Sequence, residues 1–155
     1  MCIRDRYDPL VSIADGATAS KTVLLDSMIT NIDRTAKNTN LLNWNDELWL
    51  IDHGASLYFH HNWANWEASV PRTFPMIKNH VLLERADNLV QAAAEIKTLI
   101  NEKVIQNIIA AIPEDWLTDK SSDLTPSERR AAYVTFLLAK LNNIDSLAKE
   151  AADAR

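Results

Sequence analysis

Apolar residues recur every three or four positions between Ala86 and Ile112, and this period is that of helices with one buried face. The stripe consists of Ala86, Leu89, Val90, Ala93, Ile96, Leu99, Ile100, Val104, Ile108 and Ile112. We expect these residues to be core. Asn101 is placed to divide the stripe into two helices, and Pro113 marks its end because proline lacks the backbone N–H that a helix needs.

A further helix is predicted to follow Thr125. The run Thr125-Pro126-Ser127-Glu128 is a capping box with proline at the first helical position. The apolar face expected for this helix is made of Tyr133, Leu137, Leu138 and Leu141. The second half of the chain is therefore predicted to be helical.

The first half mixes one helix with a short hairpin. Helical periodicity runs from Ser20, a plausible N-cap, to Ile32. Residues 33–40 are polar without periodicity and are predicted to form a loop. Residues 41–42 (LL) and 47–51 (ELWLI) are mostly apolar and flank a turn at 43–46, a pattern typical of a β-hairpin. Gly54 follows the hairpin, with backbone freedom that other residues lack. Residues 55–81 are aromatic and irregular. The predicted fold class is mainly α with a short β-hairpin.

Composition narrows the functional classes. The 155 residues suit one domain, and no apolar run approaches the roughly 20 residues that cross a bilayer. The net charge is −5 and no basic cluster is longer than Arg129-Arg130, which argues against a nucleic-acid partner. A single cysteine, Cys2, excludes an internal disulfide and fits a reducing compartment, so we expect a cytoplasmic protein without membrane or nucleic-acid partners.

The opening residues 1–6 have no periodicity and are expected to lead into no element. We interpret them as a non-native lead, with the true protein extending further upstream.

Three polar residues have the order and spacing of a phosphoryl-transfer site. Such sites use an Asp on a loop to accept the hydroxyl proton, and an Asn and a second Asp to hold magnesium through oxygen atoms. Here Asp33 and Asn38 lie five positions apart on the predicted loop, and Asp52 follows the predicted hairpin. The pattern predicts Asp33 as the catalytic carboxylate and Asn38 and Asp52 as metal ligands.

The surrounding sequence resembles the HipA-like kinase domain family, an atypical group within the protein-kinase-like folds. The resemblance lies in residues 25–35 (LDSMITNIDRT), 38–42 (NTNLL) and 48–61 (LWLIDHGASLYFHH). It implies a kinase C-lobe, with residues 7–81 as its catalytic and metal-binding segment and residues 82–155 as its helical remainder. It also implies Mg²⁺ and ATP as cofactors, a protein Ser or Thr hydroxyl as acceptor, and the same roles for Asp33, Asn38 and Asp52.

Arg34 is grouped with Asp33 as a catalytic residue. Its guanidinium either contacts phosphate or, as we favour, forms a salt bridge that holds the loop. Two positions depart from the commoner pattern: Thr35 stands where relatives carry His, and Asp52-His53-Gly54 replaces Asp-Phe-Gly. Neither departure removes a ligand.

The sequence lacks the features expected of the nucleotide-covering half of a kinase. A phosphate-covering loop needs several glycines, and the chain has only Gly16 and Gly54. The only lysine before the predicted loop, Lys21, lies in a helix rather than in a strand. We therefore expect this polypeptide alone to have little or no kinase activity.

Other interpretations stay open at this point. The same fold could be a non-catalytic interaction module, or the resemblance could be accidental in an unrelated helical protein. Asn40 is either a second polar support for the loop or, as the simpler account that we favour, a turn-stabilising residue. For the histidines His53, His60 and His61 we favour packing over zinc binding, and for Trp44, Trp49, Trp63 and Trp66 we favour packing over a substrate groove.

Overall fold

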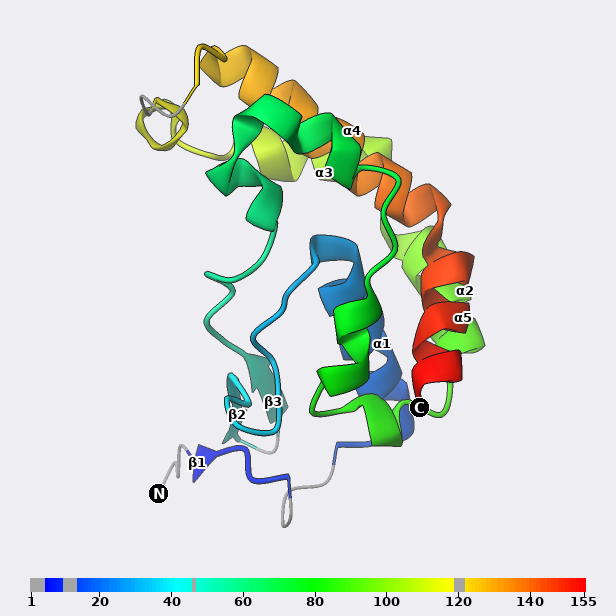
Figure 1. Ribbon diagram of the computed structural model, residues 1–155. Helices are drawn as coiled ribbons and strands as arrows, with labels where there is room; N and C mark the ends of the chain where they lie inside the picture. The colour runs from blue at the N-terminus through cyan, green and yellow to red at the C-terminus, as the bar shows by residue number, and fades with distance from the viewer. Residues whose placement is uncertain (1–4, 10–13, 46, 119–121) are drawn as a thin grey trace.

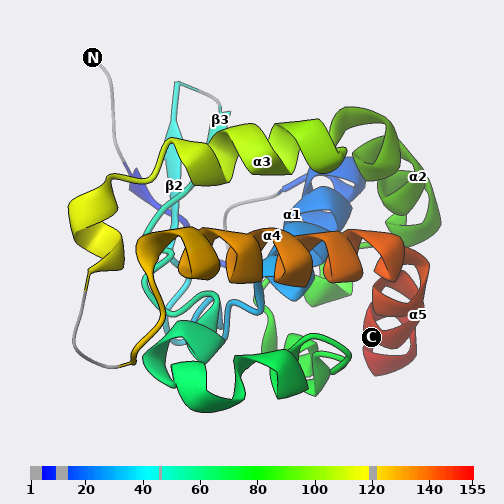
Figure 2. The same ribbon diagram turned by 90° about the horizontal axis from the view of Figure 1, so that it is seen from above.

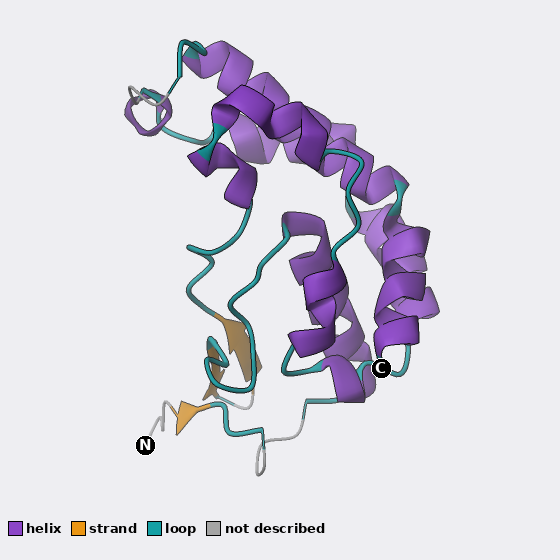
Figure 3. Ribbon diagram, in the orientation of Figure 1, coloured by secondary structure: helices purple, strands orange, loops and turns teal. Residues whose placement is uncertain are grey.

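The computed structural model describes residues 5–9, 14–45, 47–118 and 122–155. Its long elements are the helices α1 (Gly16–Ile29), α2 (Leu89–Leu99), α3 (Glu102–Ala110), α4 (Pro126–Asn142) and α5 (Ile144–Ala154), with the strands β1 (Asp5–Arg6), β2 (Leu41–Trp44) and β3 (Glu47–Leu50). Short 3₁₀ helices are η1 (Tyr58–His61), η2 (Trp63–Ser69), η3 (Pro75–Asn79), η4 (Leu83–Arg85) and η5 (Glu114–Leu117). The fold is mainly helical with a small sheet at one end, as Figures 1 and 3 show, and the predicted class is confirmed.

Helix α1 is the centre of the fold. It packs against both α2 and α5, which lie side by side along one flank of it (Figure 1). Val23 and Leu24 have no exposed surface. The helix is therefore shielded by neighbours over much of its circumference, which explains why its sequence shows no strong polar face.

Helix α1 begins earlier than predicted. Asp15 is the N-cap, because its side chain accepts a hydrogen bond from the backbone N–H of Thr18 at 2.9 Å. The predicted cap, Ser20, lies inside the helix, where its hydroxyl donates to the carbonyl of Gly16 at 2.7 Å. The predicted end at Ile32 is also wrong, since Thr30 adopts a left-handed conformation with φ 53° and ends the helix.

The predicted hairpin is confirmed. Strands β2 and β3 pair antiparallel, with Leu41 opposite Leu50 and Trp44 opposite Glu47. Strand β1 pairs with the other edge of β2, which gives the sheet order β1-β2-β3. This third strand was not expected, because a strand of two residues produces no alternation in the sequence. The interpretation of residues 1–6 as a non-native lead stays a prediction.

The helices of the second half begin at the capping residues that the sequence predicted. The side chain of Asn101 accepts from the backbone N–H of Val104 at 3.1 Å, so α3 starts anew after α2. Thr125 and Glu128 form the predicted capping box at the start of α4. Helices α3 and α4 then pack side by side, as seen from above in Figure 2. Within the described residues, no helix is long and apolar enough to cross a bilayer.

Part of the predicted apolar stripe is not core. Val90 is 83% exposed, Leu99 67% and Ile108 60%. The break at Asn101 gives α2 and α3 separate faces, so one continuous stripe cannot describe both. On α2 the buried face is instead Leu89, Ala92, Ala93 and Ile96.

The irregular aromatic segment is built of 3₁₀ turns that pack onto α4. Phe59 and Trp63 are buried, and the ring of Phe59 lies 4.6 Å from that of Phe136. Trp63 meets Tyr133 edge to face at 5.5 Å. This packing holds in place the segment that follows the predicted metal-binding residue Asp52 in the sequence.

Candidate active site

Two loops that are distant in sequence lie side by side next to α1: loop A (residues 31–40) and loop B (residues 51–57). Backbone hydrogen bonds join them, from Ile51 to the carbonyl of Asn40 at 3.0 Å and from Ile32 to the carbonyl of Ala55 at 3.5 Å. Leu57 donates to the carbonyl of Ile29 at 2.7 Å, which attaches loop B to the end of α1. The hairpin β2–β3 connects the two loops and returns the chain to the same place.

A buried carboxylate on α1 anchors loop A. Asp26 accepts hydrogen bonds from the side chains of Asn31 at 3.1 Å, Arg34 at 2.5 Å and His80 at 2.9 Å. The side chains of Asp26 and Arg34 have no exposed surface. Because all these donors converge on one carboxylate, the charge of Asp26 is compensated although it is taken out of water.

The protonation of this cluster follows from its geometry. The backbone N–H of Leu82 donates to Nδ1 of His80 at 3.0 Å, so we assign the ring proton to Nε2, which donates to Asp26. Burial by itself raises the pKa of Asp26, but the hydrogen bonds from His80 and Arg34 and the positive charge of Arg34 outweigh it. The net result is a lowered pKa for the Asp26 carboxyl.

Arg34 joins loop A to loop B. Besides Asp26, its guanidinium donates to the backbone carbonyls of Asn40 and Ile51, the latter at 3.4 Å, and it lies 3.1 Å from Nε2 of His53. The salt bridge that we favoured from the sequence is present. A phosphate contact needs an exposed guanidinium, and that of Arg34 is buried with all three nitrogens engaged. These contacts favour the loop-holding role, and its grouping with Asp33 as a catalytic residue stays a prediction.

The loop brings the predicted pair Asp33 and Asn38 into contact. The amide Nδ2 of Asn38 donates to Oδ2 of Asp33 at 2.7 Å. A tight turn makes this possible, because the backbone N–H of Thr35 donates to the carbonyl of Asn38 at 2.9 Å and the Thr35 hydroxyl accepts from the N–H of Asn38 at 3.3 Å. Threonine at this position thus supports the turn on which Asn38 is presented.

Asp52 lies at the start of loop B in a left-handed backbone conformation, with φ 50°. Its Oδ1 accepts from the N–H of Gly54 at 3.4 Å, a short turn of the kind that Asp forms readily. The residue is exposed. We expected Gly54 to use unusual backbone angles, but no glycine in the described chain has a positive φ, and Asp52 takes that conformation instead.

Asn40 connects Asp33 on loop A with Asp52 on loop B. Its amide Nδ2 donates to Oδ2 of Asp33 at 3.3 Å and lies 3.5 Å from the backbone oxygen of Asp52. These contacts support the loop role, and not the turn role that we favoured from the sequence. The sequence marks Asn40 only as a polar residue close to Asn38, and it gives no indication of which residues its side chain would contact.

The donor chemistry of the site fits a hard divalent cation. Asp33 and Asp52 supply carboxylates, and Asn38 retains its amide oxygen because it donates to Asp33 through nitrogen. Oxygen donors of this kind are what Mg²⁺ prefers. Among the described residues no three His, Cys, Asp or Glu side chains cluster as a metal site.

The three histidines considered for zinc have other partners. His53 contacts Arg34, Nδ1 of His60 lies 3.2 Å from the hydroxyl of Tyr133, and the ring of His61 stacks edge-on against that of Tyr58 at 4.9 Å. Of the tryptophans, Trp63 is core, while Trp49 is 44% exposed.

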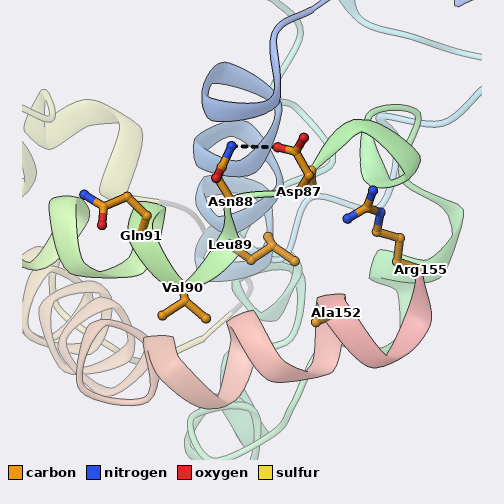
Figure 4. A pocket seen from close by; sticks show the side chains of 8 residues that line it. Asp87, Asn88, Leu89, Val90, Gln91, Ala152 and Arg155 are labelled. Carbon is orange, nitrogen blue, oxygen red and sulfur yellow. Dashed lines mark hydrogen bonds between the residues drawn. The ribbon is translucent and has the colours of Figure 1, made fainter.

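A separate open cavity of about 400 Å³ lies between the start of α2 and the end of α5. Figure 4 shows its lining, which includes Asp87, Asn88, Val90, Gln91 and Arg155. Asn88 there donates to Asp87 at 2.7 Å. None of the predicted site residues lines this cavity.

Comparison with protein families gives a match over most of the chain. A family model described as HipA-like kinase matches residues 11–146, a range that includes α1, both loops and α2 to α4. Neither a curated protein nor a solved structure matches the chain significantly.

Proposed function

The chain belongs to the HipA-like kinase family, and we propose that Asp33, Asn38 and Asp52 form the phosphoryl-transfer site of an ATP-dependent protein kinase. The family gives the kinase-like function in general terms. The specific reaction proposed is transfer of the γ-phosphoryl group of ATP to a Ser or Thr hydroxyl of a protein, with the chain acting as a kinase C-lobe.

The observation that carries this proposal is the hydrogen bond between Asn38 and Asp33, 2.7 Å long, on a loop that is bonded to the one bearing Asp52. In phosphoryl transfer an aspartate orients the attacking hydroxyl and accepts its proton. Asp33 has one oxygen, Oδ2, held by amide donors, which leaves Oδ1 for the acceptor hydroxyl. Proton acceptance at Oδ1 is the role that we assign to it.

Asn38 and Asp52 are the residues that would hold magnesium, through the amide oxygen and the carboxylate. When bound there with ATP, Mg²⁺ neutralises charge on the phosphate oxygens. Arg34 contributes indirectly, because its contacts with Asn40, Ile51 and His53 fix loop B relative to loop A. We propose that it is a positioning residue for both loops.

The proposal includes the need for a nucleotide-covering lobe. Lys21, the only lysine before loop A, lies on α1 and pairs with Glu95 at 2.6 Å, so it is not placed to bind phosphate. The chain has too few glycines for a phosphate-covering loop. A cytoplasmic setting is also proposed, and the single cysteine is its support.

The test is phosphoryl transfer from labelled ATP to protein by this chain joined to its nucleotide-covering lobe. We expect Asp33→Ala and Asp52→Ala each to lower kcat by at least about 100-fold while the circular dichroism spectrum is kept. Asp145→Asn, a change at an exposed position of α5, is the matched control and should retain activity. Retained transfer in either site variant would show that the roles are misassigned.

The same protein distinguishes the alternative of a non-catalytic interaction module. An intact fold that neither binds Mg-ATP nor transfers phosphate, with the covering lobe present, would favour that alternative. For the chain alone we expect only weak nucleotide binding, and a calorimetric titration that gives micromolar affinity for Mg-ATP would overturn the need for the second lobe.

A further inference from the structure

Asn40 has a backbone conformation that few residue types adopt without strain. Its backbone is left-handed, with φ 46°, and its side chain is buried, with 7% of the residue exposed. Asn and Gly tolerate this conformation better than other residues. The backbone oxygen of Asn40 accepts from Ile51 and from Arg34, so the residue is fixed at the junction of the two loops.

The side chain of Asn40 reaches both functional ends of the site. Nδ2 carries two hydrogens, and the two acceptors within reach are Oδ2 of Asp33 at 3.3 Å and the backbone oxygen of Asp52 at 3.5 Å. One amide group can therefore bond to the carboxylate of loop A and to the backbone of loop B at the same time. No other side chain in the described ranges hydrogen-bonds to both Asp33 and Asp52.

The two amides of Asn38 and Asn40 meet on the same oxygen of Asp33. This arrangement restricts rotation of the carboxylate and leaves Oδ1 as its open oxygen. The donor from Asn40 is independent of the Asn38 oxygen that would bind metal. Asn40 can therefore keep Asp33 oriented whether or not Asn38 is engaged elsewhere.

We propose that Asn40 is a positioning residue for phosphoryl transfer, which sets the orientation of Asp33 and its separation from the metal-binding Asp52. This inference rests on the proposed function. Its expected kinetic signature is a loss in kcat with little change in KM for Mg-ATP, because Asn40 orients the base without touching the nucleotide. Small misplacements of a reacting group cost up to about 100-fold in rate.

The decisive variant is Asn40→Gly, which keeps the left-handed backbone accessible and removes the side chain with its amide. We expect kcat to fall roughly 10- to 100-fold and KM for Mg-ATP to change less than about threefold. The matched control is Asn45→Gly, because Asn45 also has a left-handed backbone, φ 51°, but lies in the hairpin turn outside the site. An unchanged kcat in Asn40→Gly, or a loss equal to that of Asn45→Gly, would overturn the proposal.

A second measurement does not depend on activity. In the isolated chain, solvent exchange of the Asn40 side-chain amide protons, followed by ¹⁵N NMR, should become at least about tenfold faster in Asp33→Ala, which corresponds to loss of one hydrogen bond to a charged group. The internal control is the amide of Asn31, which donates to Asp26 and should not change. Equal exchange of Asn40 in both proteins would contradict the contact. If the parent enzyme shows no transfer at all, it is the proposed function that fails, and this exchange result still decides whether Asn40 holds Asp33.

Discussion

Nε of Arg34 lies 2.5 Å from Oδ2 of Asp26, and neither side chain has any exposed surface. The pair joins the central helix α1 to the loop that bears Asp33. Arg34 then continues to the backbone of loop B and to His53. This buried ion pair is thus one of the links that attach the candidate active site to the core of the fold.

Removing the charge of Asp26 should destabilise the whole chain. In Asp26→Asn the guanidinium of Arg34 stays buried without its counter-charge, and breaking such a pair costs about 3 to 5 kcal/mol. Urea denaturation followed by circular dichroism measures this change. The control is Asp145→Asn, which removes an exposed pair with Lys97 and should cost less than about 1 kcal/mol. Equal losses for the two variants would contradict the account.

The same carboxylate makes stability depend on pH. Burial raises the pKa of the Asp26 carboxyl, but the hydrogen bonds from His80 and Arg34 lower it by more than burial raises it. The pKa in the folded chain therefore lies below the unfolded value of 3.8. A depressed folded pKa stabilises the fold above the unfolded pKa, and this contribution is lost as pH falls through the folded pKa. The difference in unfolding free energy between the parent chain and Asp26→Asn should be constant from pH 7 to about pH 5 and shrink below about pH 4. A difference that grows on acidification would have the wrong sign.

Arg34→Lys separates a loop-holding role from a phosphate contact. Lysine keeps the charge but lacks the planar fork that reaches Asp26, two carbonyls and His53 together. We expect a loss of roughly 3 kcal/mol in the free energy of unfolding, measured in urea. A fully stable variant whose only defect is a raised KM for ATP would instead assign the guanidinium to phosphate.

The core of the aromatic segment gives a prediction about packing alone. Phe136 is 1% exposed and stacks near Phe59, so Phe136→Ala should cost about 3 to 5 kcal/mol in thermal or urea unfolding. Trp116 is 77% exposed on η5, and Trp116→Ala should change stability by no more than about 0.5 kcal/mol. A reversed order would mean that the aromatic segment is not part of the core.

Local signals in the sequence predicted local structure well. Asn101 and the Thr125–Glu128 box are caps whose hydrogen bonds lie within one turn, and both appear as predicted. The start of α1 was predicted wrongly, because Ser20 is a residue type that often caps helices but lies inside this one, which Asp15 caps. Which one is used depends on burial, since Ser20 also accepts from the backbone of Asn88, far along the chain.

Spacing also predicted the contact between Asp33 and Asn38, which lie on one loop. It could not predict the anchor of that loop, because His80 reaches Asp26 from 54 positions away. Exposure of Val90 and Ile108 was missed for a similar reason: the relative rotation of α2 and α3 is set by tertiary packing and not by periodicity.

The most direct test of the shared site is an anomalous diffraction map. Crystals of this chain with its nucleotide-covering lobe would be grown with Mn²⁺ and a non-hydrolysable ATP analogue, with Asp52→Ala as the matched variant. We predict a manganese peak in contact with the side-chain oxygens of Asn38 and Asp52, beside Asp33, and loss of that peak in the variant. Bound nucleotide whose manganese lies away from both side chains would contradict the account.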